Sequence, residues 1–224
     1  MPTIVLHQWE MSPFCNKVRR VLKAKRLDFE VVNYNGLLAP RAAKLSKVGT
    51  LPVMDYGDER VPDSAAIVRF LEERYPTPAL IPADAEVRAS AHVWEDWAAQ
   101  SLYFFEIYFR MLVPEARERA LELITRGRPA YERPIVRAVI KSRYPRKLKA
   151  QGLGRLPAAE VERQWFAHVD ALDAILAKRT WLAGDALSIG DVSVAAQIDE
   201  VLRTSDLAGK IRERTHVMAW LERM

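Results

Sequence analysis

The sequence predicts a protein of two unlike domains, an α/β domain followed by an all-α domain. Two observations lead to this class. Short strand-like apolar runs alternate with helical patterns in the first third of the chain, whereas long helical patterns fill the remainder. Between the two parts, residues 75–82 contain three prolines, which disfavour helix and sheet and stiffen a linker. We therefore expect an α/β domain at 1–76, a linker at 77–82 and an all-α domain at 83–224.

The composition of the chain excludes several kinds of site and of protein. The chain has 224 residues, of which 50% are hydrophobic, enough to bury proper cores. Its single cysteine excludes an internal disulfide and a multi-cysteine metal site. The four histidines are scattered without ligand spacing, so we expect no metal. The chain starts directly with strand-like sequence, and no apolar run approaches about 18 residues, so we expect a cytoplasmic protein with no integral membrane segment.

The first strand and the first helix meet at Ser12-Pro13-Phe14-Cys15. An apolar run before this segment predicts a strand, and a basic amphipathic pattern after it predicts a helix. Pro13 suits the first helical position, where its missing N–H costs nothing. Ser12 then faces the unpaired N–H groups and the positive end of the helix dipole. A thiolate is stabilised at such a turn, whether it belongs to the protein or to a bound thiol.

Two later segments complete the candidate site. Pro52 stands at the head of a predicted strand, where no ladder donor is lost, and a cis Leu51–Pro52 bond would turn the Leu51 backbone outward to pair with an extended peptide. The next helix begins near Asp63 and Ser64, which can cap it, and its N-terminal N–H groups favour an anion such as a carboxylate. Taken alone, Asp63-Ser64 is a plain N-cap. Because Asp63-Ser64 follows the other two segments in the chain, the three together favour a binding site.

The second part of the chain predicts long helices. Residues 83–113 are rich in Ala, Glu and aromatic residues and lack Gly and Pro, and residues 157–179 repeat apolar groups at helical spacing. Within the first of these helices we expect a core stripe, whereas Tyr103 lies one step off it and is a candidate for facing the cleft between the domains. The expected stripe consists of Phe104, Tyr108 and Met111.

Ser188 and Asp191 have the spacing of a capping box at the start of a later helix. Each side chain of such a box satisfies a backbone N–H of the other residue. We assign this pair to folding and not to chemistry.

In this order, the segments resemble the glutathione transferase superfamily, of the cytosolic bacterial type. Residues 1–76 look like its thioredoxin-like domain, and the segment at Ser12 resembles a glutaredoxin-type C-P-[YF]-C site with its first cysteine replaced by serine. Leu51-Pro52 resembles the cis-proline element of the family, and Asp63-Ser64 the acid-serine pair that holds the γ-glutamyl end of glutathione. The element order implied is strand 3–8, helix 13–26, strand 28–33, helix 39–46, strands 52–56 and 59–61, and helix 63–74.

The resemblance implies a glutathione transferase, commonly a homodimer, that takes reduced glutathione as co-substrate and adds its sulfur to a hydrophobic electrophile. The implied binding residues are Leu51, Pro52, Asp63 and Ser64. Lowering the pKa of a thiol from about 8.5 by two units requires roughly 2.7 kcal/mol. One charge-assisted hydrogen bond supplies about 1.5–3 kcal/mol, and a helix terminus adds about 0.3–1 kcal/mol. A serine hydroxyl at the start of a helix therefore suffices, and Ser12 is the candidate donor to the thiolate.

Cys15 is the alternative catalytic residue. It occupies the second-cysteine position of the glutaredoxin-like pattern, where the sulfur usually points inward, and lone cysteines are among the most buried residues. If Cys15 were exposed, its pKa would fall and it would form a mixed disulfide with glutathione, which would make the protein a glutathione-dependent thiol transferase or reductase. The serine at position 12 argues against that chemistry.

A basic segment spans residues 126–155, with ten basic residues and a single acid, Glu132. A solvated face is the ordinary interpretation of such a run, and an anionic partner is the sharper alternative. A third hypothesis follows, in which the chain is a non-catalytic scaffold that uses this segment as its interaction surface. The basic residues are Arg126, Arg128, Arg133, Arg137, Lys141, Arg143, Arg146, Lys147, Lys149 and Arg155.

Overall fold

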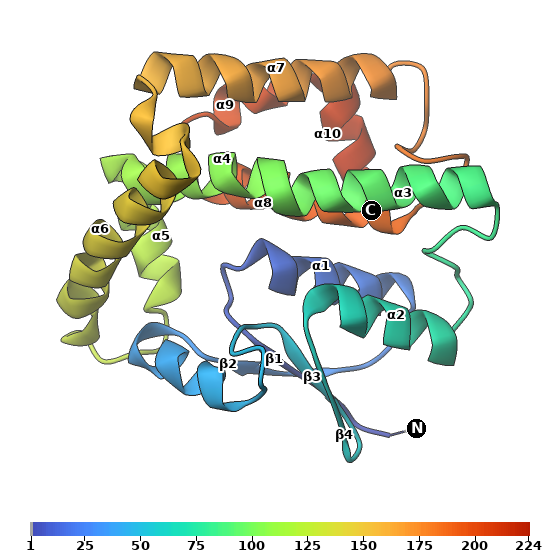
Figure 1. Cartoon of the computed structure of the whole chain (residues 1–224), viewed down its shortest axis with the longest axis horizontal. Helices are drawn as coiled ribbons and strands as arrows, with labels where there is room; N and C mark the ends of the chain where they lie inside the picture. The colour runs from blue at the N-terminus through green and yellow to red at the C-terminus, as the bar shows by residue number, and fades with distance from the viewer. Residues whose placement is uncertain (1) are drawn as a thin grey trace.

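The computed structural model describes residues 2–224 and begins with a four-stranded mixed sheet in the order β2-β1-β3-β4 (Figure 1). Strand β1 (Ile4–Gln8) pairs in parallel with β2 (Glu30–Asn33) and antiparallel with β3 (Val53–Tyr56), which pairs antiparallel with β4 (Glu59–Pro62). Helices α1 (Pro13–Ala24) and α2 (Ser64–Arg74) lie between this sheet and the helical part of the molecule. The predicted class, a thioredoxin-like α/β part followed by a helical part, is confirmed.

The rest of the chain is helical. Helix α3 (Ala85–Trp97) continues without a break through η2 (Ala98–Leu102), α4 (Tyr103–Ile107) and η3 (Tyr108–Leu112). The elements that follow are α5 (Pro114–Ile124), α6 (Glu132–Gln151), η4 (Leu153–Arg155), α7 (Ala158–Leu176), α8 (Ile189–Thr204), α9 (Ala208–Arg212) and α10 (Thr215–Glu222). No helix within residues 2–224 is long and apolar enough to cross a membrane.

Two expectations about local structure are corrected. The helix expected at 39–46 is instead η1 (Gly36–Lys44), a 3-10 helix with Pro40 inside it. The long helix at 83–113 contains two π-helical segments, η2 and η3. Each π turn takes an extra residue and rotates the buried face.

This rotation changes the aromatic stripe. Tyr108 and Met111 are buried as expected, but Phe104 is only half-buried, and Phe105 and Phe109 are buried in its place. The register of a straight helix therefore does not describe this part of the core.

Helix α8 joins the two parts, since it packs against both α1 and α3. Its N-terminus is closed by the expected capping box, in which Asp191 accepts hydrogen bonds from the backbone N–H and the hydroxyl of Ser188 at 3.0 and 2.7 Å. One turn of α8 lies so close to α3 that a Cβ on Gly190 would stand 2.8 Å from the Cβ of Trp94. The two helices can approach this closely only because position 190 has no side chain.

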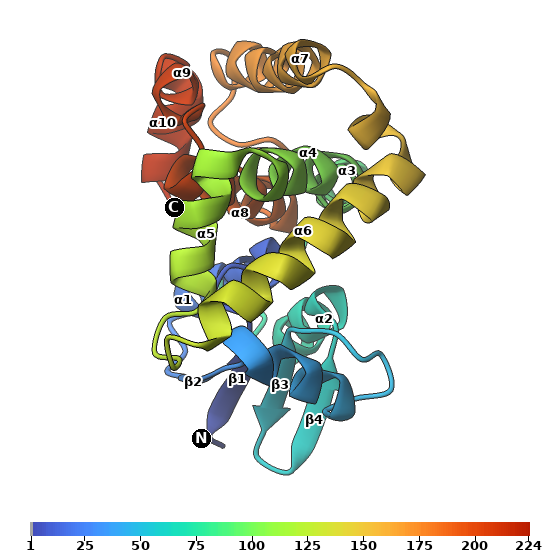
Figure 2. The same ribbon diagram turned by 90° about the vertical axis from the view of Figure 1, so that its left-hand side faces the viewer.

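Helix α6 crosses from the helical part to the sheet part, where its first turn meets η1 (Figure 2). The buried carboxylate of Glu132 accepts a hydrogen bond of 2.8 Å from the backbone N–H of Leu37 and pairs with Arg128. The sole acid of the basic segment thus fixes α6 to the sheet part of the chain.

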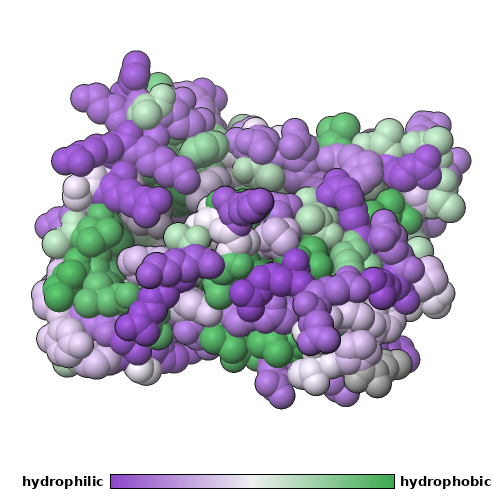
Figure 3. Space-filling view, turned by 60° about the horizontal axis from the view of Figure 1, so that its bottom comes forward, coloured by the Kyte–Doolittle hydropathy of each residue, from purple (hydrophilic) through white to green (hydrophobic). Residues whose placement is uncertain are grey.

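The face on the sheet side is mostly hydrophilic, with separate hydrophobic patches (Figure 3). Strand β2 forms one edge of the sheet and is exposed along its whole length, Val31 and Val32 included. The backbone groups on the outer side of β2 are therefore open to solvent or to a further strand.

Candidate functional site

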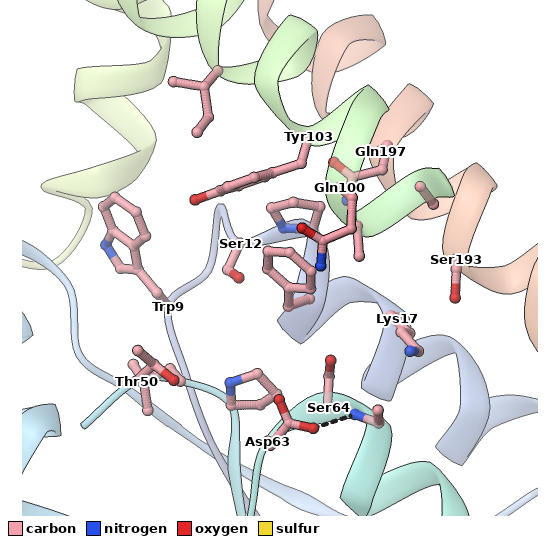
Figure 4. A pocket seen from close by; sticks show the side chains of 18 of the residues that line it. Trp9, Ser12, Lys17, Thr50, Asp63, Ser64, Gln100, Tyr103, Ser193 and Gln197 are labelled. Carbon is pink, nitrogen blue, oxygen red and sulfur yellow. Dashed lines mark hydrogen bonds between the residues drawn. The ribbon is translucent and has the colours of Figure 1, made fainter. Parts of the chain in front are cut away.

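A cavity of about 900 Å³ lies where the N-termini of α1 and α2 meet α3, α4 and α6. Figure 4 shows Ser12, Asp63 and Ser64 on its sheet side and Gln100 and Tyr103 on its helical side. Leu51 and Pro52 also line it. The cavity therefore brings together all three segments that the sequence singled out, although they are up to 52 residues apart in the chain.

Ser12 closes the first turn of α1. Its backbone is extended, with φ −86° and ψ 125°, and its hydroxyl accepts a hydrogen bond of 3.3 Å from the backbone N–H of Cys15. Pro13 follows at the first helical position, as expected. A hydroxyl has one donor and two acceptor positions, and the cap uses only an acceptor position. The hydroxyl of Ser12, whose residue lines the cavity, also interacts with the thiol of Cys15 and acts to lower the pKa of that thiol.

Cys15 lies behind this turn, outside the lining of the cavity. Its side chain is completely buried. Burial raises the pKa of the Cys15 thiol to about 11, because a buried thiolate loses its hydration. The structure thus places the two sequence candidates differently, with Ser12 at the cavity and Cys15 in the protein interior.

Asp63 caps α2 with an unusual backbone. One carboxylate oxygen, Oδ1, accepts hydrogen bonds from the N–H groups of Ala65 and Ala66 at 2.9 and 3.1 Å. The φ of Asp63 is +74°, a region that costs a non-glycine residue of the order of 1–3 kcal/mol and recurs at ligand-binding sites. Ser64 follows as a buried residue, and both side chains point into the cavity in Figure 4. The cap holds Asp63 in a strained conformation that presents its carboxylate to the cavity.

The second and third segments are linked through their backbones. The Leu51–Pro52 bond is cis, and the carbonyl of Pro52 accepts a hydrogen bond of 3.2 Å from the N–H of Asp63. Gly49, with a φ of +70°, begins the turn that leads into them. This turn therefore sets the position of Leu51 relative to the N-terminus of α2.

A charged pair that the sequence analysis missed lies beside the N-terminus of α2. The ammonium of Lys17, from α1, pairs with the carboxylate of Glu95, from α3, and both residues line the cavity although they are mostly buried. Burial lowers the pKa of Lys17, while Glu95 opposes that effect. A lysine on the apolar face of an amphipathic helix was the only signal in the sequence, and its partner lies 78 residues away.

The far wall of the cavity is aromatic and basic. Phe14 and Tyr103 lie 5.0 Å apart between ring centroids, in a tilted arrangement. The ammonium of Lys147, from α6, lies 4.7 Å from the Tyr103 ring centroid and donates a hydrogen bond of 3.1 Å to its hydroxyl. Arg143 and Tyr144 line the same wall. The expectation that Tyr103 faces the cleft is confirmed, whereas the sequence did not indicate that the basic segment reaches the cavity.

A buried charged cluster adjoins this wall, and its arginine, Arg110, is among the residues that line the cavity. Arg110 is almost fully buried and pairs with Glu106 at 2.6 Å and with Glu200 at 3.5 Å, and its guanidinium also donates to the carbonyl of Met11. Burial raises the pKa of Glu106 to about 8. This cluster ties the loop before α1 to α8, and so holds one wall of the cavity in place.

Trp9, which precedes α1, lines the cavity, whereas its neighbours Gln8 and Met11 are buried outside the lining. Arg41 and Lys44 of η1 also lie outside it.

Comparison with known proteins gives a consistent result. The family described as "Glutathione S-transferase, N-terminal domain" matches residues 6–79, and "Glutathione S-transferase, C-terminal domain" matches residues 114–223. "Glutathione S-transferase 1" of Dianthus caryophyllus is 39% identical over 88 residues, which cover 38% of this chain and 40% of that protein. "Glutathione S-transferase 3" of Zea mays is 27% identical over 232 residues, covering 99% of this chain and 89% of that protein.

Solved structures agree on the fold. "FzlA from C. crescentus" superposes with a TM-score of 0.68 at 21% identity, covering 99% of this chain and 87% of that chain. Likeness at this level of identity concerns the fold alone.

Proposed function

Because the chain belongs to the glutathione S-transferase superfamily, we propose that it binds reduced glutathione in this cavity and conjugates its thiolate to a hydrophobic electrophile. The observation that carries the proposal is the convergence of two helix N-termini on one cavity. Ser12 opens α1, Asp63 and Ser64 open α2, and all three residues line the same space. Each N-terminus favours a negative group, one the thiolate and the other a carboxylate.

The residues around α2 fit the γ-glutamyl end of glutathione. Oδ1 of Asp63 is engaged with the helix N–H groups, so Oδ2 is the oxygen available to an ammonium group. The hydroxyl and the backbone N–H of Ser64, the first residue of α2, suit the adjacent carboxylate, because Asp63 already engages the N–H groups of Ala65 and Ala66. The backbone of Leu51, next to the cis bond, is the candidate partner for the peptide backbone of the ligand.

The residues around α1 fit the thiol end. Glutathione supplies the nucleophilic sulfur, and the hydroxyl of Ser12 donates a hydrogen bond to it while the end of α1 adds its dipole. Together these contribute about 2–4 kcal/mol, enough to lower the pKa of a thiol by roughly two units. Ser12 remains protonated and orients the thiolate toward the electrophile.

The buried position of Cys15 supports conjugation over disulfide chemistry. A thiol transferase needs an accessible, acidic thiol, whereas Cys15 is completely buried and burial raises its pKa to about 11. The proposal therefore assigns the thiolate to glutathione and a packing role to Cys15. We further propose that the protein acts in the cytoplasm, where glutathione is the reducing thiol, as a homodimer.

Calorimetric titration with reduced glutathione tests the proposal. Asp63→Asn keeps an oxygen for the α2 cap and tolerates a positive φ, but it removes the charge. We expect the wild type to bind in the micromolar-to-millimolar range and Asp63→Asn to bind at least about fivefold more weakly, as for the loss of one charge-assisted contact.

A matched control separates binding from folding. Asp84 caps α3 with the same pattern, accepting from the N–H groups of Glu86 and Val87, and lies outside the cavity lining. Asp84→Asn is expected to leave glutathione affinity unchanged. Absence of glutathione binding by the wild type at high millimolar concentration would refute the proposal.

A further inference from the structure

We infer that the electrophile taken by this protein is an aromatic compound that carries a carboxylate, bound between Tyr103 and the cationic side chains of α6. The inference rests on the proposed transferase function and specifies its second substrate. Three features of the cavity carry it, namely its aromatic wall, the cations on the same wall, and the distribution of acids around it.

The aromatic wall faces the proposed thiolate site. Phe14 and Tyr103 lie 5.0 Å apart, Trp9 lines the cavity nearby, and Figure 4 shows Trp9 to the left of Ser12 and Tyr103 above it. Aromatic side chains arranged in this way bind a planar ring through its faces and edges. A ring held there lies near the hydroxyl that we assign to the thiolate.

Two cations of this wall lack an acidic partner. Within the described residues, neither Arg143 nor Lys147 forms an ion pair with a carboxylate. The ammonium of Lys147 contacts the ring and hydroxyl of Tyr103 and lies 5.8 Å from the ring centroid of Phe104. Burial and the nearby charge of Arg143 lower the pKa of Lys147, and the charge of Glu106 opposes them without cancelling the shift.

The start of the basic segment is arranged differently. Arg126 pairs with Glu10, Arg128 with Glu132, and both Arg133 and Arg137 with Glu118. These four arginines share three carboxylates of the protein, whereas the two cations at the cavity pair with none. The cations of the basic segment that have no acidic partner therefore face the cavity as well as solvent.

The acids of the cavity lie elsewhere. Asp63 and Glu95 belong to the part beside α2, and Asp96 precedes Tyr103 by seven residues, about 10 Å along the helix. Glu106 and Glu200 are buried behind the wall and pair with Arg110. An anionic group between Arg143 and Lys147 thus meets two cations and no exposed carboxylate, which gives a carboxylated ring a preferred orientation.

Two matched electrophiles test the inference. In 4-chloro-3-nitrobenzoate and 4-chloro-3-nitrobenzamide, the sulfur of glutathione forms a bond to the ring carbon, chloride leaves with the bonding pair, and the thiol proton passes to solvent. The kcat/KM for each is divided by its uncatalysed rate constant with glutathione, which removes the intrinsic difference in reactivity. We expect the normalised value to be at least about fivefold higher for the benzoate, as for one partly desolvated ion pair.

Variants of α6 show whether the cations cause the preference. The double variant Arg143→Gln, Lys147→Gln is expected to make the normalised values for the two electrophiles equal. Lys147→Glu is expected to make the benzamide the better substrate. The control Arg146→Gln, Lys149→Gln removes two exposed cations of the same helix that lie outside the cavity lining, and is expected to leave the ratio unchanged. The preference should also weaken as ionic strength rises, because the Debye length falls from about 10 Å at 0.1 M to about 3 Å at 1 M.

The outcomes separate this inference from the proposed function. Equal normalised rates for the two electrophiles, with glutathione-dependent turnover intact, would overturn the carboxylate preference alone. A preference that the control pair also removes would overturn the assignment to Arg143 and Lys147. Absence of glutathione-dependent turnover with either compound would overturn both.

Discussion

The hydroxyl of Ser12 accepts a hydrogen bond of 3.3 Å from the backbone N–H of Cys15, so a side chain that lines the cavity also caps α1. The same geometry turns the sulfur of Cys15 into the core, where it is completely buried. One turn of helix therefore separates a residue suited to hold a foreign thiolate from a thiol that is kept neutral. The first two predictions concern this pair.

We predict that Ser12→Ala lowers kcat/KM for conjugation by about 10- to 100-fold, the cost of one charge-assisted hydrogen bond to the thiolate. The acid limb of the pH–rate profile should move to higher pH, because the thiol of bound glutathione regains a pKa closer to 8.5. Loss of the cap should also cost about 1 kcal/mol of stability. Asp84→Ala, which removes the cap of α3, controls for that loss. An unchanged pH profile in Ser12→Ala would contradict the assignment.

We predict that Cys15 is unreactive in the folded protein. An aromatic disulfide reagent at pH 7 should label no thiol until the chain is unfolded in denaturant, and then one per chain, because only the thiolate reacts and burial raises the Cys15 pKa to about 11. Cys15→Ala should keep conjugating activity and lose about 1 kcal/mol of stability through a small cavity. Rapid labelling of the native protein, or loss of activity in Cys15→Ala, would favour disulfide chemistry instead.

The cluster of Glu106, Arg110 and Glu200 predicts a pH-dependent stability. The carboxyl of Glu106 titrates near 4.3 in the unfolded chain, but burial raises its pKa to about 8 in the folded protein. Between these values the folded state holds a proton that the unfolded state has released, so stability falls as pH rises from about 4 to about 8. Urea unfolding of Glu106→Gln should show a weaker decline over this range than the wild type. An exposed control, Glu222→Gln, should keep the wild-type slope.

We predict that replacing two glycines by alanine has opposite effects on the free energy of unfolding. A Cβ at Gly190 would stand 2.8 Å from the Trp94 side chain and 3.0 Å from the carbonyl oxygen of Ala91, whereas a Cβ at Gly209 in α9 meets nothing within 4 Å. Gly190→Ala should therefore destabilise the protein by about 1–3 kcal/mol through overpacking of α3 on α8. Gly209→Ala should stabilise it by about 0.5–1 kcal/mol through helix propensity. Thermal unfolding measures both, and a neutral Gly190→Ala would show that the helices can separate at little cost.

The contact of Glu132 with Leu37 predicts how α6 is held over the cavity. Glu132→Ala removes the acceptor of the Leu37 N–H and the partner of Arg128, so the amide of Leu37 should exchange with solvent faster. Glu160→Ala removes an Arg–Glu pair on the surface of α7, with Arg163, and should leave Leu37 exchange unchanged. Unaltered exchange in Glu132→Ala would mean that α6 is positioned by other contacts.

Much of the fold could be predicted from the sequence because its signals are local. Pro13 and Ser12 mark the start of α1, Asp63 marks the start of α2, and Ser188 with Asp191 marks the start of α8. Each of these signals depends on a few neighbouring backbone groups that need a partner. The two π-helical segments within residues 98–112 were not predictable in this way, since they follow the packing of aromatic residues against distant helices.

The candidate site likewise has one part that local sequence predicts and one part that it does not. The sequence by itself determined its sheet side, because Ser12, Leu51-Pro52 and Asp63-Ser64 each lie at a turn whose chemistry is set by the residues next to it. Only the tertiary structure decided that Lys17 meets Glu95, that Arg143 and Lys147 of a solvent-facing pattern line the cavity, and that Cys15 lies outside it. Pairing and burial of this kind arise when helices far apart in the chain pack together. The spacing of residues within one helix does not indicate which other helix it packs against.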